Sequence, residues 1–142
     1  MFNDTITVYQ HEEATENTEE HWKRTVIEGC MWSEEIVKAN ASDGTINVSK
    51  VVNITIPTSA RTDRKYIDYR LYSSQVAQDE FFTLNPTTNM DVVALGLCEA
   101  DITADYTLSK LLREYISATI SSVKDNTGDS RRHLRNIKVV AK

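Results

Sequence analysis

The side chains that could bind a metal or act as nucleophiles are few and widely separated. The chain has two cysteines, Cys30 and Cys98, and three histidines, His11, His21 and His133. No spacing among them matches the ligand pattern of a zinc site. We therefore expect two reduced, mostly buried thiols and predict neither a bound metal nor a cofactor.

Sequence motifs for catalysis are equally sparse. A serine nucleophile elbow requires Gly-x-Ser-x-Gly and a phosphate-binding loop requires clustered glycines, whereas the four glycines of this chain stand apart. The acidic segment His11–Glu20 has no apolar periodicity and is expected to be an exposed loop, which gives its carboxylates no fixed geometry for a metal. Pairs of catalytic carboxylates stay open, because only the fold sets their separation. We predict that the protein is not an enzyme.

The elements that would have to position any site are mostly strands. Alternating, β-branched runs predict strands at 4–9, 21–35, 47–56, 80–84, 90–95, 118–124 and 134–140. Ile6 and Val8 should share one face of the first run, and Gly29 should interrupt the second as a bulge. Residues 80–84 and 90–95 should pair through the turn 85–89, whereas 66–72 could be a short strand or a turn.

One short helix is expected late in the chain. Leu108, Leu111, Leu112, Tyr115 and Ile116 form an i, i+3, i+4, i+7, i+8 stripe, with Thr107 as the N-cap. Two β-rich runs follow it, joined by the polar turn 125–130. The sequence thus predicts a single domain over residues 1–142, mainly β, a small barrel of about six or seven strands with long loops and one short helix near the C-terminus.

Two features are candidates for interaction. Residues 58–65 are polar and basic without periodicity, so they could be a solvated loop or an assembly loop carried by Ser59, Arg61, Asp63, Arg64 and Lys65. Trp22 and Trp32 could each pack in the core or anchor an interface. The basic group 131–135, which contains His133, is expected at the rim of a hairpin.

The charge of the chain restricts its partners. Residues 1–60 carry 4 basic against 10 acidic side chains, and the whole chain has a net charge of −5. A protein that binds DNA regardless of sequence usually has the opposite balance, because neutralising phosphates supplies its affinity. We predict no tight DNA binding. No apolar run approaches the roughly 20 residues that a membrane span needs, and the first residues do not have the pattern of a signal peptide.

The order of these features resembles the head–tail joining proteins of tailed phages and prophages of Gram-positive bacteria, also called head-closure or stopper proteins. The matching segments are 4–9, 22–32, 52–57, 89–96, 122–126 and 137–140, followed by a terminal lysine. The chain departs from the family pattern at Asn89-Met90-Asp91, where such proteins often have a Gly-Asp pair before the strand.

The resemblance implies a structural β-barrel protein that joins a ring at the neck of the capsid. Such a protein would be made in the host cytoplasm and would contact other neck proteins on the portal or adaptor side and on the tail side. It would form a homo-oligomeric ring in the virion, with a monomer in solution left open, and DNA would pass nearby. The alternatives are a tail-end completion protein, a β-barrel module that binds a protein or ligand, and, least favoured, an enzyme.

Overall fold

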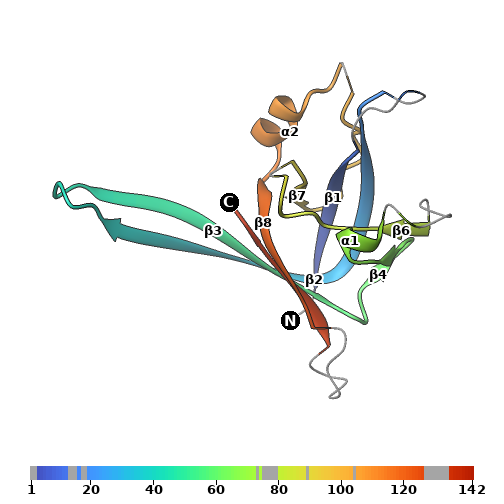
Figure 1. Ribbon diagram of the computed structural model, residues 1–142, viewed down its shortest axis with the longest axis horizontal. Helices are drawn as coiled ribbons and strands as arrows, with labels where there is room; N and C mark the ends of the chain where they lie inside the picture. The colour runs from blue at the N-terminus through green and yellow to red at the C-terminus, as the bar shows by residue number, and fades with distance from the viewer. Residues whose placement is uncertain are drawn as a thin grey trace.

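Six strands form a closed antiparallel ring. The computed structural model describes residues 3–12, 16, 19–72, 74, 80–88, 90–103, 105–126 and 135–142. The strand order is β1-β7-β8-β9-β3-β2, and pairing of β2 with β1 closes the ring (Figure 1). The strands are β1 (Asp4–Glu12), β2 (His21–Asn40), β3 (Ile46–Pro57), β7 (Val92–Leu95), β8 (Ser117–Asp125) and β9 (Asn136–Ala141). The prediction of a small, mainly β barrel is confirmed.

Shorter elements lie outside this ring. They are β4 (Arg61–Thr62), which pairs with β2, the parallel pair β5 (Lys65–Tyr66) and β6 (Phe81–Phe82), and the helices α1 (Tyr69–Tyr72) and α2 (Leu108–Glu114). The sequence predicted α2 but not α1. None of the helices in the described ranges has the length and apolar character that crossing a membrane requires.

β2 is a 20-residue strand that changes partner halfway along its length. Its first half pairs with β1 up to Cys30, and its second half pairs with β3 from Met31 onward. At the junction Asp4 lies opposite Cys30 but Thr5 lies opposite Glu28, so one residue of β2 has no counterpart.

That extra residue is Gly29, whose φ of +86° is a conformation that suits glycine. The register shift and this φ together define a β-bulge, which bends a strand and increases its twist. The bulge predicted at Gly29 is therefore confirmed, and it allows β2 to leave β1 and run alongside β3.

The inside of the ring is the main core. Alternate residues of every strand point inward, and Ile6 and Val8 of β1 are each 1% exposed, as their alternation predicted. Further members of this cluster are Ile27, Cys30, Val52, Ile54, Ile56, Phe82, Leu84, Val93, Ala118, Ile120, Ile137, Val139 and Ala141.

A second, smaller core lies on the outer face of the ring. The residues of β1 that alternate with Ile6 and Val8 include Tyr9, which is buried against Cys98 and Leu111 of the segment carrying α2. The Tyr9 hydroxyl donates to the Ala100 carbonyl at 2.6 Å. Both cysteines are buried and free, as expected.

The predicted start of the helix at Thr107 is confirmed. The predicted apolar stripe is wrong at two of its positions. The Thr107 side chain accepts a hydrogen bond from the Lys110 amide, and Leu111 is buried. Leu112 and Ile116, however, are 41% and 55% exposed. The helix ends at Glu114 and the next residue is extended, so Ile116 does not share the helical face that its spacing implied.

The pairing predicted between residues 80–84 and 90–95 is wrong. Phe81 and Phe82 instead pair in parallel with β5, and β7 lies between β1 and β8. The Asp91 carboxylate accepts the Asn85 amide at 2.8 Å, which closes this connection without a hairpin ladder. The predicted hairpin of the two last strands is confirmed, because β8 and β9 are antiparallel neighbours. Its turn beyond Asn126 and the basic group 131–134, with His133, lie outside the described residues.

Replacing Leu111 with Ala should lower the free energy of unfolding by about 2–5 kcal/mol, because it opens a cavity in the outer core. The matched change Leu112→Ala, one position along at a side chain 41% exposed, should alter it by no more than about 0.5 kcal/mol. Urea unfolding followed by circular dichroism measures both values. Equal losses in the two variants would show that α2 is packed differently.

Candidate functional site

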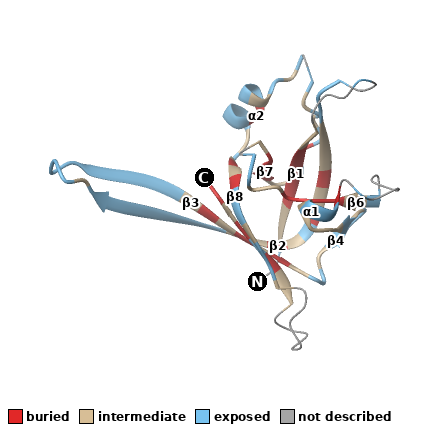
Figure 2. Cartoon of the chain, viewed as in Figure 1, coloured by how far each residue is buried: buried red, intermediate tan, exposed pale blue. Residues whose placement is uncertain are grey.

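Beyond the ring, β2 and β3 continue as a two-stranded arm, which we define as residues 33–51. β1 pairs with β2 only as far as Cys30, and β9 pairs with β3 only from Val52 onward. The strands of the arm therefore pair only with each other within the described part of the chain. Figure 1 shows the arm extending away from the ring, and Figure 2 shows that it is exposed along almost its whole length.

One face of the arm continues the inner surface of the ring. Residues directly opposite in an antiparallel ladder share a face, and so do alternate pairs. The pair Trp32–Ile54 belongs to the inner core. The alternate pairs beyond it are Glu34–Val52, Ile36–Lys50, Lys38–Val48 and Asn40–Ile46. We call this side the inner face of the arm.

The inner face of the arm is apolar and weakly cationic. Ile36, Ile46 and Val48 lie on it with 68%, 64% and 62% of their surfaces exposed. Lys50 forms an ion pair with Glu34 at 3.0 Å, whereas Lys38 has no ion pair among the described residues. The opposite face has a single exposed large apolar residue, Val37, at 39%. The apolar surface is thus concentrated on one side.

The tip of the arm is a well-defined turn. The Ala41 amide donates to the Thr45 carbonyl at 2.8 Å, and Gly44 has a φ of +89°. The Asp43 carboxylate accepts the Thr45 hydroxyl at 2.7 Å and the Thr45 amide at 3.0 Å. These hydrogen bonds, that of the hydroxyl first, hold the pKa of Asp43 below its ordinary value. Asn40, Ser42, Asp43 and Gly44 make residues 39–44 a turn cluster in the sequence, and the observed turn, closed between Ala41 and Thr45, overlaps this cluster with a displacement of about one residue.

The two candidate anchors, Trp22 and Trp32, lie at different places on β2, and both are half-buried. Trp32 stands at the base of the arm, where its amide donates to the Asp4 carboxylate at 2.9 Å and its ring packs on the inner core. Trp22 packs on the outer core and makes an edge contact with His11, with ring centroids 4.8 Å apart. The structure does not bring the two indoles together.

The predicted assembly loop is held against the ring at two points, β4 and Arg64, although the sequence indicated only a polar loop without periodicity. β4 and β5 interrupt it, and β4 extends the sheet along β2. Arg64 donates from Nη1 to the Arg24 carbonyl at 2.8 Å and to the Thr25 hydroxyl at 3.1 Å. The loop is therefore held in place by the hydrogen bonds of Arg64 and by the short pairing of β4 with β2. Neither interaction needs a periodic pattern of apolar residues in the sequence.

The other predicted loop residues point outward. Ser59, Asp63 and Lys65 are exposed. Arg61 forms an ion pair with Glu28 at 3.3 Å, and both side chains are more than half exposed. An exposed ion pair of this kind stabilises a fold little. Because both side chains are exposed, they are accessible for contact with a partner.

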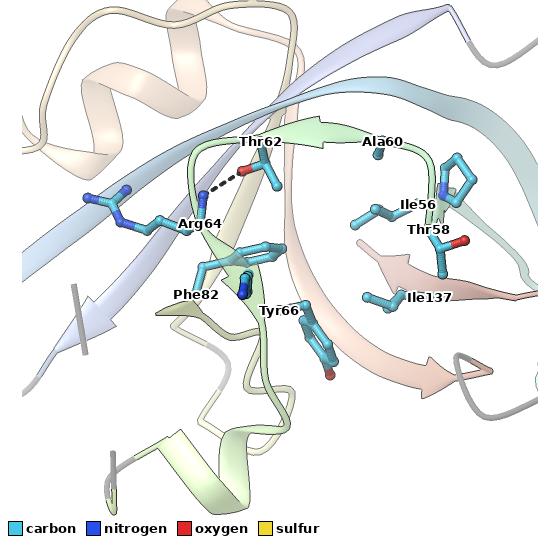
Figure 3. A pocket seen from close by; sticks show the side chains of 10 residues that line it. Ile56, Thr58, Ala60, Thr62, Arg64, Tyr66, Phe82 and Ile137 are labelled. Atoms are coloured by element: carbon cyan, nitrogen blue, oxygen red, sulfur yellow. Dashed lines mark hydrogen bonds between the residues drawn. The ribbon is translucent and has the colours of Figure 1, made fainter. Parts of the chain in front are cut away.

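A cavity of about 350 Å³ lies between this loop and the ring. Figure 3 shows Ile56 and Ile137 on one side and Tyr66 with Phe82 on another, below the segment that carries Ala60 and Thr62. Tyr66 and Phe82 meet edge to face, with centroids 5.7 Å apart. Burial, first of all, raises the pKa of Tyr66 to about 12, so its hydroxyl is neutral at pH 7.

A polar network that the sequence did not predict joins β1, β2 and α1. Lys23 Nζ donates to the Tyr72 hydroxyl at 2.8 Å, and this hydroxyl donates to Glu12 at 2.8 Å. The other oxygen of Glu12 lies 2.6 Å from His21 Nε2. The donors and acceptors satisfy one another, so the network fixes α1 against the ring. Its members are up to 60 residues apart in the chain, and no local pattern indicates them.

Sequence reasoning also missed the arm. It ended the second strand at Glu35 and began the third at Asn47, and it assigned the intervening residues mainly to a turn cluster. The signal that could have revealed the arm is length, because barrel strands are usually about 3–10 residues long and β2 alone has 20. Apolar residues alternating with lysines on both sides of Gly44 were a second signal.

Comparison with known proteins identifies a family without an assigned function. A family of unknown function, DUF6751, matches residues 1–142. No curated protein and no solved structure matches the chain significantly.

The stability of the protein should depend on the protonation of Asp91. Burial raises the pKa of this carboxyl to about 6, against the opposing effect of the amides of Asn85 and His11, which donate to it. Between pH 4 and 6 the folded state then holds a proton that the unfolded state has lost. The free energy of unfolding should fall by up to about 1.4 kcal/mol per pH unit in that window from this group.

Asp91→Asn should remove this contribution, so the difference in unfolding free energy between wild type and variant should shrink or change sign from pH 4 to 6. Urea titrations at several pH values measure it. Asp105→Asn, at an exposed carboxylate, is the matched control and should leave the pH profile unchanged. Parallel profiles for wild type and Asp91→Asn would contradict the buried, protonated carboxyl.

Proposed function

Since the chain belongs to the DUF6751 family, whose function is not assigned, we propose from its own features that it is a structural virion protein. In this proposal it is a head–tail connector or head-closure component of a tailed phage or prophage. It joins the neck of the capsid to the tail and helps to retain the packaged DNA.

The observation that carries the proposal is the arm. A lone two-stranded ribbon is marginally stable in water, because neither face is covered and each strand has an unpaired edge. The arm nevertheless exposes Ile36, Ile46 and Val48 on one side. An apolar face on a projecting ribbon is costly unless another protein covers it. Assembly into a larger particle supplies such a cover.

The segments that resemble head-closure proteins also support the proposal, because they coincide with the framework of the ring. Residues 4–9 belong to β1, residues 22–32 to β2 with its bulge, and residues 52–57 to β3. Residues 137–140 belong to β9. Four of the six matching segments therefore lie on strands of the closed barrel.

The net charge of −5 is compatible with a channel through which DNA passes without binding tightly to the protein. A negative surface repels phosphates, and the repulsion is screened within about 10 Å at ordinary salt. In this proposal DNA passes near the ring without tight binding. The partners are neck proteins on the head side and the tail side, and other copies of this chain.

The cavity beside Tyr66 and Phe82 favours one alternative, a barrel module that binds a small ligand or a short peptide. Its volume of about 350 Å³ lies within the usual range of ligand sites, and its lining combines apolar side chains with the polar or charged side chains of Thr58, Arg64 and Lys65. A binding module of this kind would work as a free protein and would not be retained in purified particles.

Antibody against this protein, applied with gold label to particles released by prophage induction, should mark the junction between head and tail. Labelling is expected there because a neck ring stays in the finished virion. Antibody raised against the major capsid protein is the control and should mark the whole head. Particles without label at the junction, with the protein free in the lysate, would contradict the proposal and favour the binding module.

A further inference from the structure

The large apolar side chains exposed in the described chain gather in two places. Four of them belong to the arm, and three belong to the segment 96–116, which carries α2. The first group is Ile36, Val37, Ile46 and Val48, the second is Leu97, Leu112 and Ile116, and Leu71 of α1 stands apart. The chain therefore exposes large apolar side chains mainly on two segments, the arm and residues 96–116.

These two segments differ in charge. The inner face of the arm carries Lys38, which has no ion pair in the described residues, beside the paired Lys50. The described part of segment 96–116 carries four acidic side chains, Glu99, Asp101, Asp105 and Glu114, against two basic ones, Lys110 and Arg113. Asp101 is paired with Arg24 and Glu114 accepts from Tyr106, which leaves the carboxylates of Glu99 and Asp105 available.

The two segments do not meet within one molecule. Figure 1 shows the arm extending away from the ring, whereas α2 lies on the body of the protein. α2 is held there by Leu111, by the backbone hydrogen bond from Leu95 to Ile116, and by the other contacts of the outer core. The inner face of the arm, apolar and weakly cationic, and the acidic segment 96–116 with its exposed apolar side chains are complementary between copies.

We propose that the inner face of the arm of one copy docks on the segment 96–116 of a second copy of this chain. This contact is head-to-tail, because the arm of one copy meets a different surface, segment 96–116, on the next copy. Contacts of that type close into a ring when the rotation between copies permits. The inference rests on the proposed function, since it assigns the contact that would hold a neck ring together.

Docking would cover the three apolar side chains of the inner arm face and bring Lys38 near Glu99 and Asp105. Val37 on the opposite face would stay exposed to solvent. This difference between Val48 and Val37 gives a matched pair of positions on the same ribbon, one inside the proposed contact and one outside it.

The test is cross-linking of purified protein with a short bis-maleimide. Chains carrying Val48→Cys are mixed with differently tagged chains carrying Leu112→Cys, at about 50 μM, and products joining the two tags are counted. The native thiols give little background, since Cys30 and Cys98 are buried and burial raises the pKa of both. All substituted side chains are exposed, so the ring should fold in each variant, which circular dichroism verifies.

The expected result is about tenfold more mixed product than in the control mixture of Val37→Cys with Leu112→Cys, because a docked pair reacts at an effective concentration near the millimolar range. A Lys38→Glu change added to the Val48→Cys chain should reduce the yield. Equal yields in the two mixtures would overturn the proposal. So would products formed mainly between two Val48→Cys chains, because they would assign arm-to-arm pairing instead.

This outcome is independent of the gold-labelling result. Label at the junction together with equal cross-linking would keep the neck assignment and remove the arm contact. Cross-linking without label at the junction would keep the contact between copies and remove the neck assignment.

Discussion

The closed ring depends on the β-bulge at Gly29. Before the bulge the inward side chains of β2 are odd-numbered, as at Thr25 and Ile27, which lie opposite Val8 and Ile6. After it they are even-numbered, as at Cys30 and Trp32. A shift of one residue sends every following side chain to the other face of a strand. The extra residue therefore bends β2 toward β3 and also decides which side of its second half faces the core.

The character of the arm follows from the same shift. The alternation that begins after Gly29 continues along β2. Ile36 and Lys38 therefore lie on the same face as Cys30 and Trp32, which face the inner core. β3 continues the pattern with Val48 and Lys50 opposite them. β9 pairs with β3 only from Val52 onward, so the part of β3 that precedes Val52 is not covered by β9 and its apolar side chains face water. The arm thus has the side-chain pattern of a barrel strand pair but lies outside the closed ring.

Local patterns predicted the parts of this fold that local chemistry decides. Alternation located β1, β8 and β9, an isolated glycine predicted the bulge, and Thr107 began the helix. Pairing partners are set by contacts distant in the chain, so the association of β6 with β5 and of β7 with β1 was out of reach. At the candidate site, the sequence predicted Trp22, Trp32 and the loop 58–65 as elements of interest, but it missed the arm. The only local signs of a strand that extends past its neighbours are its length and, here, the apolar residues that alternate with lysines on both sides of Gly44.

The energetics of the arm favour a contact that is weak alone and strong in a ring. Full burial of a Val or Ile side chain is worth about 1.5–3 kcal/mol, so three such residues yield only several kcal/mol. Losses of translational and rotational freedom on association are of similar or larger size. A single docked pair would then dissociate readily at low concentration. In a closed ring every copy is held twice, and the last contact forms within one assembly at high effective concentration. Under the proposed function, the copies would be mostly separate at low concentration and would complete the ring where a neck surface gathers them.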